Sequence, residues 1–321
     1  VRLGFPDTTY TEHVAENSPN GTLIRTLPIW NKNKHSKDTP LKCLLTKTSQ
    51  KGTFYVKLTS ERDCAIYLNQ TLDYETTTEY SLEIQLESIQ GLINPESNQA
   101  VIKIHVTDVN DNVPIFVFNE QSNISGAKEK YFAIATKDMP LGTNVLQVKA
   151  KDKDSGDFGK IEYHKNAWTK AAEEYFHLDS DTGVITNIKT FENVPKEILP
   201  FKFNVMARDN PKSEDYKTAR ASVVINLLQK DNQLIVEVPN LNVDAMTTLE
   251  ARNLLSTIET KSGLVAGLEK LTPRLYLGEN GTLESDPKGT NVWLYLLDPS
   301  SGEILTRESE PGLFVAELQK R

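Results

Sequence analysis

The sequence is poor in several features that mark common functional classes. Its 321 residues include only two cysteines and five histidines. No apolar run approaches the roughly 18 residues that a membrane-spanning helix needs. Basic residues are also in deficit, with 36 Lys and Arg against 44 Asp and Glu and a net charge of −8. This balance counts against nucleic acid as a partner, because a nucleic-acid footprint needs a basic face. It favours cations as partners instead.

Motifs of catalysis are missing as well. The histidines, at positions 13, 35, 105, 164 and 177, form no i,i+4 pair, and the chain has no G-x-S-x-G, P-loop or Rossmann fingerprint. Asp73 and Glu75 would share one face of a strand, as a glycosidase acid and base could. Two carboxylates that bind a cation would also share one face of a strand, so this arrangement does not favour catalysis. We therefore expect that the protein is not an enzyme.

Two features concern the cellular compartment. The only cysteines are Cys43 and Cys64, and without a second pair they cannot complete a four-thiolate zinc site. They could be two buried free thiols or a single disulfide between strands. Four N-x-S/T sequons favour an extracellular glycoprotein and therefore the disulfide. The sequons start at Asn20, Asn69, Asn123 and Asn280.

Length and hydrophobic alternation predict several β-rich domains. A chain of 321 residues suits two or three domains better than one. Segments such as 81–87, 101–106 and 201–205 alternate so that apolar side chains fall on one face of a strand. Turn-forming residues separate these segments at the spacing that is typical of a β-sandwich.

An internal repeat organises the first part of the chain. Three anchors recur at offsets of 121, 119 and 120 residues: Pro19–Thr22 with Pro140–Thr143, Leu72 with Phe191, and Asp111-Asn112 with Asp231-Asn232. A repeat of this length predicts two tandem copies of one sandwich. We expect the first copy over residues 1–117 and the second over residues 118–234.

The pattern changes in residues 235–321. A strand over 234–238 precedes a capping box at 247–250, which predicts the start of a helix that Gly263 ends. Strands near 274–277 and 292–297 follow, and a second helix is predicted over 313–320. The order βαββα suits a split βαβ arrangement, so we expect an α+β domain here.

Oxygen-bearing side chains gather in short motifs around the first domain boundary. Hard cations such as Ca²⁺ take roughly six to eight oxygen ligands from carboxylates, amides and backbone carbonyls. A single Asp-x-Asp is usually a solvated turn, but several such motifs in order around one boundary indicate a cation site. The carboxylates are those of Glu16, Asp73, Glu75, Asp108, Asp111, Asp152, Asp154 and Asp209.

An EF-hand is the competing interpretation of these acids. Residues 152–156 begin like an EF-hand loop, and so do residues 179–183. The twelfth position of such a loop must be a bidentate Glu. It is Tyr163 in the first case and Thr190 in the second, so both segments fail the requirement.

The motifs resemble the calcium-binding set of cadherin extracellular repeats. They read VAEN at 14–17, LDYE at 72–75, DVNDN at 108–112, AKDKD at 150–154 and ARD at 207–209, and the resemblance covers residues 1–234. It implies Greek-key sandwiches whose linker holds about three Ca²⁺ ions. The implied ligands are the side chains of Glu16, Asp73, Glu75, Asp108, Asn110, Asp111, Asp152, Asp154 and Asp209 and the carbonyls of Val109, Asn112 and Phe158.

The second boundary departs from this pattern. Lys137 stands where the first copy has Glu16, and Leu228 stands where it has Asp108. Residues 191–194 read FENV in place of LDYE. Because a lysine repels a cation, we expect the second joint to bind no calcium. Direct packing of the second sandwich on the α+β domain would hold it instead.

The resemblance also implies a function. A calcium-free last linker before a ferredoxin-like membrane-adjacent domain is similar to the atypical cadherins of hair-cell tip links. It implies a force-bearing adhesive element on the extracellular side of the plasma membrane, in stereocilia, with the full-length protein anchored in the membrane. The implied partners are a second copy in a parallel cis homodimer and the tetraspan and channel subunits of the transduction complex. The alternative is a receptor ectodomain segment whose α+β domain mainly binds a signalling partner.

Overall fold

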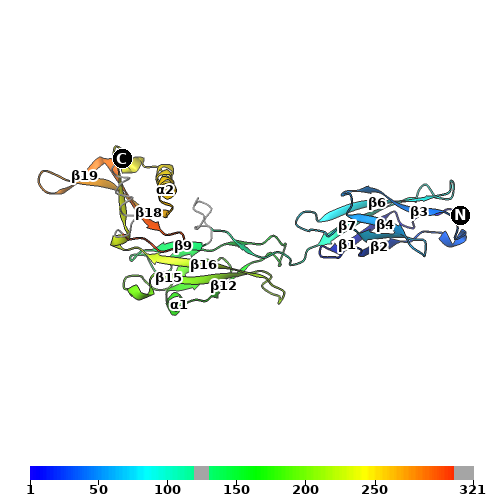
Figure 1. The fold of residues 1–321 in the computed structure, drawn as a ribbon, viewed down its shortest axis with the longest axis horizontal. Coiled ribbons are helices and arrows are strands. Elements are labelled where there is room, and N and C mark those ends of the chain that lie inside the picture. Colours follow the sequence, from blue (N-terminus) through cyan, green and yellow to red (C-terminus); the bar gives the residue numbers. More distant parts are fainter. Residues whose placement is uncertain (119–129, 307–321) are drawn as a thin grey trace. The chain divides into compact units, whose positions relative to one another are not determined.

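The computed structural model describes residues 1–118 and 130–306 (Figure 1). The Asn123 sequon and the helix expected over 313–320 lie outside these residues. The chain divides into two compact units. The first contains residues 1–112 together with 153–158, and the second contains residues 113–152 and the described residues from 159 onward.

The first unit is a β-sandwich. Its four-stranded sheet has the order β1 (Thr9–Ala15), β7 (Gln99–Thr107), β6 (Glu79–Ser88) and β3 (Leu41–Thr48). Its three-stranded sheet has the order β2 (Leu23–Leu27), β5 (Cys64–Leu68) and β4 (Phe54–Leu58). A short 3₁₀ turn, Lys32–Lys34, follows β2. Strand β1 runs parallel to β7, and the other neighbours are antiparallel.

Alternating apolar residues form the core between these two sheets. Ile84 of β6 and Ile102 of β7 are fully buried against Ile66 of β5, as expected for strands that present one face to the interior. A disulfide joins Cys43 of β3 to Cys64 of β5, with an S–S distance of 2.00 Å. The bond therefore links one sheet of the sandwich to the other.

A second sandwich with the same strand order belongs to the second unit. Its four-stranded sheet is β12 (Glu162–Asn166), β15 (Phe201–Arg208), β16 (Thr218–Leu227) and β9 (Lys130–Ala135). Its three-stranded sheet is β10 (Asn144–Gln147), β14 (Val184–Asn187) and β13 (Phe176–Leu178). The remaining elements are a strand pair of β8 (Ile115–Phe116) with β11 (Ala150–Lys151), helix α1 (Lys170–Tyr175), and 3₁₀ turns at Lys196–Ile198 and Lys230–Asn232.

The turns that carry the sequence repeat have the same structure in both sandwiches. In Pro19–Thr22 and in Pro140–Thr143, the threonine hydroxyl donates a hydrogen bond of 2.6 Å to the proline carbonyl. The glycine between them has a φ of 84° in the first turn and 78° in the second. Glycine adopts this left-handed region without steric cost, so the recurring Gly-Thr pair reflects one recurring turn.

The last module of the second unit packs one helix on a three-stranded sheet. It contains β17 (Leu234–Val238), a 3₁₀ turn (Val243–Ala245), α2 (Thr248–Ser262), β18 (Val265–Leu277) and β19 (Leu283–Leu297). The sheet order is β17-β19-β18, with both neighbour pairs antiparallel. Ile258 of α2 packs on Val292, Leu294 and Leu296 of β19. None of the helices in the described ranges is long and apolar enough to cross a membrane.

The predicted helix and the positions of the two predicted strands are confirmed, but both strands are longer than the segments that the sequence indicated. Thr247 and Glu250 form the capping box of α2, and Gly263 ends the helix with a φ of 70°. The strands expected at 274–277 and 292–297 are parts of one long hairpin, β18–β19. Pro273 and two shifts of register interrupt the alternation inside β18, which hides its length in the sequence.

Candidate metal centre

Five acidic residues of the first unit form a continuous cluster. Carboxylate oxygens of Glu16, Asp73 and Glu75 lie within 4.8 Å of one another, and so do those of Glu75, Asp108 and Asp154. Glu75 belongs to both groups and connects them. We call these five residues the acidic cluster. Oxygens at this spacing can bind one cation together.

Glu16 draws three segments of the chain together. It follows β1, and its side chain is almost completely buried, with 2% of the residue exposed. One carboxylate oxygen accepts a hydrogen bond from the backbone N–H of Tyr74 (2.8 Å), and the other accepts one from the N–H of Val109 (2.9 Å). The LDYE loop and the linker after β7 are thereby held against the end of β1.

Asp108 has one satisfied and one unsatisfied carboxylate oxygen. Its Oδ2 accepts hydrogen bonds from the backbone N–H of Ser155 (2.7 Å) and from the Ser155 hydroxyl (2.5 Å). Its Oδ1 is buried and has no hydrogen-bond partner among the described residues. A buried carboxylate oxygen is costly unless a donor or a cation pairs with it, so Asp108 fits the role of a metal ligand.

The linker contacts Asp154 through amide groups. The backbone N–H of Asn112 lies 3.1 Å from Asp154 Oδ2, and the Asn112 side-chain amide donates to Asp154 Oδ1 across 2.5 Å. The same amide also donates to Asp111 Oδ1, at 2.8 Å. The predicted carbonyl ligand Val109 accepts a hydrogen bond from the Asp111 N–H at 2.9 Å. Asn110 and Asp154 are buried.

Burial, and then repulsion among neighbouring carboxylates, raises the pKa of several of these acids. Desolvation, followed by repulsion from Glu16, raises the pKa of Glu75 to about 7. Desolvation also raises the pKa of Glu16, although its two backbone hydrogen bonds oppose the change. Asp111 has a raised pKa through desolvation and then repulsion from Asp154. Each shift means that the site favours a positive charge, whether a proton or a metal ion.

The remaining predicted ligands divide between the units. Phe158 belongs to the first unit, whereas Asp152 and Asp209 belong to the second. Carboxylate oxygens of Asp152 and Asp209 lie within 4.8 Å of each other. Asp209 is fully buried, and its Oδ1 accepts a hydrogen bond of 2.6 Å from the Lys217 N–H.

The donor set fits a hard divalent cation. It consists of carboxylates and amide groups, without a cysteine or histidine ligand, and oxygen donors of this kind suit Ca²⁺ rather than zinc or copper. Sequence reasoning did not anticipate Tyr74 and Ser155, which fix the orientation of Glu16 and Asp108. For Ser155 a signal existed, since it directly follows Asp154.

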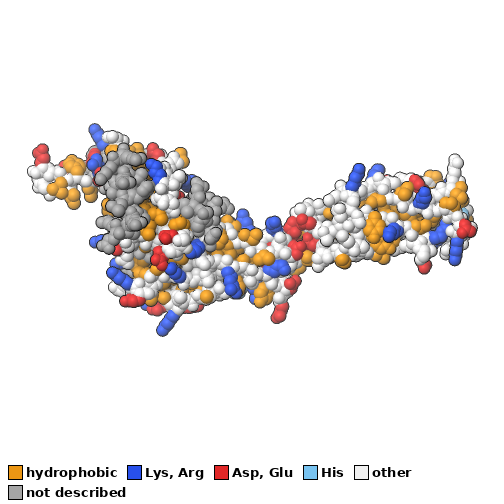
Figure 2. Space-filling view, in the orientation of Figure 1, with side chains coloured by type: hydrophobic (Ala, Val, Ile, Leu, Met, Phe, Trp, Pro, Cys, Tyr) orange, Lys and Arg blue, Asp and Glu red, His pale blue; other side chains and the backbone are white. Residues whose placement is uncertain are grey.

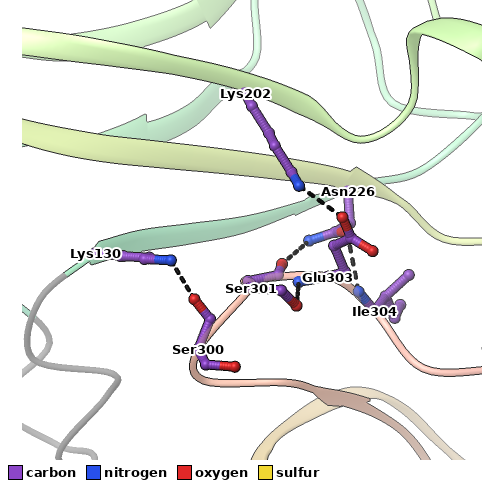
Figure 3. Close-up of polar contacts among 8 residues, drawn as sticks. Lys130, Lys202, Asn226, Ser300, Ser301, Glu303 and Ile304 are labelled. Atoms are coloured by element: carbon purple, nitrogen blue, oxygen red, sulfur yellow. Dashed lines mark hydrogen bonds and ion pairs between the residues drawn. The ribbon is translucent and has the colours of Figure 1, made fainter.

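The second boundary is built from direct contacts between the second sandwich and the last module (Figure 3). The side-chain amide of Asn226 in β16 donates to the carbonyl of Gly302 (2.8 Å), and its oxygen accepts from the Ile304 N–H (3.0 Å). Lys202 pairs with Glu303 at 2.6 Å, and Lys130 donates to the Ser300 carbonyl. These contacts surround one loop, residues 300–304.

Asn232 makes a further contact at this boundary. Its side-chain oxygen accepts a hydrogen bond from the Gln229 N–H (2.9 Å), and its amide donates to the Leu305 carbonyl (3.1 Å). The charged residues that line a neighbouring cavity are three lysines and three acids, namely Lys137, Lys196, Lys230, Asp138, Asp231 and Glu269. Within the described ranges, no group of side chains able to hold a metal includes a residue after Asp209.

Three of the predicted glycosylation sites can be located. Asn20, Asn69 and Asn280 are exposed and lie in turns or directly after a strand. The side-chain amide of Asn69 also donates to the Gly52 carbonyl, at 2.8 Å. A sequon needs an accessible asparagine, and these three meet that condition.

Many known proteins resemble this chain, and three of them are described here. Cadherin-99C of Drosophila melanogaster is 31% identical over 96% of this chain and 18% of its own length. Protocadherin-15 of Gallus gallus is 26% identical over 92% of this chain and 15% of its own length. The crystal structure of Drosophila N-cadherin EC1-4 matches with a TM-score of 0.55 and 28% identity, over 71% of this chain and 50% of that one. The chain thus spans less than a fifth of these two curated relatives, and no protein-family model matches it.

Proposed function

We propose that this chain is a force-bearing element in which Ca²⁺ stiffens the first linker. It is a cadherin-repeat extracellular segment, homologous to atypical members of the cadherin superfamily. The observation that carries this proposal is the acidic cluster, together with the unsatisfied Asp108 Oδ1. About three ions would bind there, as the resemblance implies.

The acidic cluster would supply most of the ligands. Asn110, Asp111 and the carbonyls of Val109, Asn112 and Phe158 would join it, and the resemblance adds Asp152 and Asp209. When bound, Ca²⁺ supplies positive charge that offsets the mutual repulsion of these carboxylates. Glu16 then keeps the linker at Val109 and the LDYE loop at Tyr74 in place, because its carboxylate accepts hydrogen bonds from both backbones.

The second joint would work without calcium. Asn226, Asn232 and Lys202 hold the last module by direct contacts, and the position equivalent to Glu16 is Lys137. The sheet order β17-β19-β18 supports a ferredoxin-like assignment, since this is the order of a split βαβ unit. We assign this membrane-adjacent domain to residues 235–321, after cadherin repeats at 1–117 and 118–234.

The likeness to protocadherin-15 supports the cellular role. The full-length protein would be anchored at the plasma membrane, with this segment on the extracellular side, and stereocilia are the proposed location. It would form a parallel cis homodimer. The tetraspan and channel subunits of a transduction complex would be its membrane partners.

Calcium titration tests the core of this proposal. We expect Ca²⁺ to bind the chain with measurable heat and to raise the melting temperature of the first unit. Glu16→Gln should weaken the binding by about tenfold or more, since one lost charge contact of about 1.4 kcal/mol has that effect. Glu61→Gln, at an exposed turn of the same unit, is the matched control. A melting curve that Ca²⁺ leaves unchanged would contradict the proposal.

A further inference from the structure

One of the four sequons differs from the others in the residue that precedes it. Tyr67 lies two positions before Asn69, whereas the other three sequons have a serine, a glutamine or a glycine at the corresponding position. Side chains two residues apart on a strand point to the same face of the sheet. If the strand continues to Asn69, the tyrosine ring therefore lies beside any sugar that the asparagine carries.

The strand pairing does continue past β5 as far as Asn69. The β4–β5 register pairs Phe54 with Leu68. The backbone N–H of Asn69 donates to the Thr53 carbonyl at 2.8 Å, which extends this register by one residue. Leu68 is fully buried, whereas Asn69 is exposed. Asn69 and Tyr67 therefore lie on the same outer face of the three-stranded sheet β2-β5-β4.

Tyr67 belongs to a strip of apolar side chains on that face. Its cross-strand partner in β4 is Tyr55, with 5.2 Å between the two ring centres and 13° between the ring planes. Its partner in β2 is Leu23, which is 51% exposed. Cross-strand partners share a face, so these three residues cross all three strands, and we call them the tyrosine strip. Figure 2 shows apolar side chains at the surface of the first unit.

A hydrogen bond orients the side chain of Asn69. Its Nδ2 donates to the Gly52 carbonyl at 2.8 Å. The amide of an asparagine carries two hydrogens on this nitrogen. Attachment of a sugar replaces one of them, and the other can keep the bond to Gly52. The side chain is thus held in place without losing its ability to carry a glycan.

A sugar suits the tyrosine strip as its occupant. One face of a pyranose ring consists of C–H groups with a slight positive charge, and the face of an aromatic ring is negative. The sequon places such a sugar directly next to the Tyr67 ring. A glycan is also bulky and solubilising, so it would keep other proteins from docking on the strip.

We propose that Asn69 carries an N-linked glycan whose first N-acetylglucosamine lies on the Tyr67 ring and covers the tyrosine strip. In the transfer step, Asn69 Nδ2 attacks C1 of the sugar in a lipid-linked oligosaccharide diphosphate. The N–C1 bond forms, the bond between C1 and the phosphate oxygen breaks, the lipid diphosphate leaves, and the amide gives up one proton. The assignment rests on the extracellular location in the proposed function, because this transfer takes place in the secretory pathway.

The full chain, secreted from a eukaryotic host that makes high-mannose glycans, tests the proposal. Mass spectrometry of its peptides should find Asn69 glycosylated. Thr71→Ala removes the sequon but keeps the Asn69 amide, and it should lower the melting temperature of the first unit by about 4 °C through the lost sugar contact.

Two controls accompany this variant. The same Thr71→Ala substitution should have no effect in chain secreted to the bacterial periplasm, where no such glycan is attached. Asn20→Gln removes another sequon of the same unit, which has a serine two positions before the asparagine. It should shift the melting temperature by less than about 1 °C.

Trimming and a second substitution locate the contact. An endoglycosidase that leaves one N-acetylglucosamine on Asn69 should preserve the melting temperature, because only that sugar lies on the ring. Tyr67→Thr lowers the melting temperature with or without the glycan, since it removes the stacking on Tyr55. The drop should be about 4 °C larger in the glycosylated chain than in the Thr71→Ala background, and this difference measures the contact between sugar and ring.

Two results would overturn the proposal. An unmodified Asn69 in the chain from the eukaryotic host would remove the glycan. An occupied Asn69, with equal drops for Tyr67→Thr in both backgrounds, would place the sugar in solvent and away from the ring. Neither result would change the calcium titration of the first linker, so a failure here is distinct from a failure of the proposed function.

Discussion

The side-chain amide of Asn226 donates a hydrogen bond to the backbone carbonyl of Gly302 across 2.8 Å. Asn226 is buried in β16, and Gly302 lies in the loop after β19, so the bond joins the second sandwich to the last module. The amide oxygen accepts from the Ile304 N–H in the same loop. The Asn226 side chain thus pairs with both a backbone carbonyl and a backbone N–H of the loop after β19.

Asn226→Ala should therefore loosen this junction. The substitution leaves the Gly302 carbonyl and the Ile304 N–H without their partner, at a cost of about 2 kcal/mol in local stability. Hydrogen exchange of residues 300–305 should become faster, while exchange in the first unit stays unchanged. Asn144→Ala, at an exposed position of β10, is the control. Unchanged exchange at Ile304 in the Asn226 variant would show that other contacts hold the loop.

Gly302→Ala should destabilise the same junction through sterics. A Cβ at Gly302 would lie 2.8 Å from atoms of Phe132 and Val224, and the residue has a φ of 75°. Gly281 is a matched control, because its φ is 72° but no atom lies within 4 Å of its added Cβ. Gly302→Ala and the control Gly281→Ala should each cost about 1 kcal/mol of unfolding free energy through backbone strain. Gly302→Ala should cost about 1–3 kcal/mol more for overpacking. Equal losses of unfolding free energy would contradict the tight packing of this loop.

Asp111 and Asp231 occupy equivalent positions of the repeat, and we expect them to differ in calcium binding. Desolvation, followed by repulsion from Asp154 of the acidic cluster, raises the pKa of Asp111, and its substitution by alanine should reduce Ca²⁺ affinity by about tenfold or more. Asp231 lines a cavity in which three lysines balance three acids, and no metal-holding group of the described residues includes it, so Asp231→Ala should leave affinity and stoichiometry unchanged. Isothermal titration of both variants measures the difference. A loss of bound calcium in Asp231→Ala would place an ion at the second joint.

Glu75 should make calcium binding depend on pH near neutrality. Without metal its pKa is raised to about 7, so the folded state holds a proton that the unfolded state has lost. The stability that this proton contributes is present at low pH and is lost as the pH rises through about 7. Ca²⁺ needs the ionised carboxylate, so affinity should increase from pH 6 to pH 8, with proton release at the lower pH.

Glu75→Gln provides the comparison for this pH effect. The variant should bind Ca²⁺ more weakly at every pH, and its affinity should change less across the same interval, because the titrating group is gone. Titration in buffers of different ionisation enthalpy counts the protons released. Equal proton release in both proteins at pH 6 would assign the effect to another carboxylate.

Local signals in the sequence were strong enough to predict several elements. The capping box at Thr247 and Glu250 and the glycine at position 263 predict α2, because each supplies a partner or a conformation that a helix end requires. The six-residue α1 was not predicted, since one and a half turns show too little periodicity. The first part of β18, before Arg274, also escaped prediction, because a bulge and a proline break its alternation.

The sequence by itself determined which residues carry the oxygens of the candidate metal centre and which boundary has lost them, since residue identity and spacing suffice for that. Only the tertiary structure decided how the first set is assembled. Glu16 meets Tyr74 and Val109, which are 58 and 93 positions away, and Asn226 meets Gly302 across 76 positions. Contacts at such separations depend on how the sheets pack, because packing, and not local propensity, brings distant backbone groups within hydrogen-bonding distance.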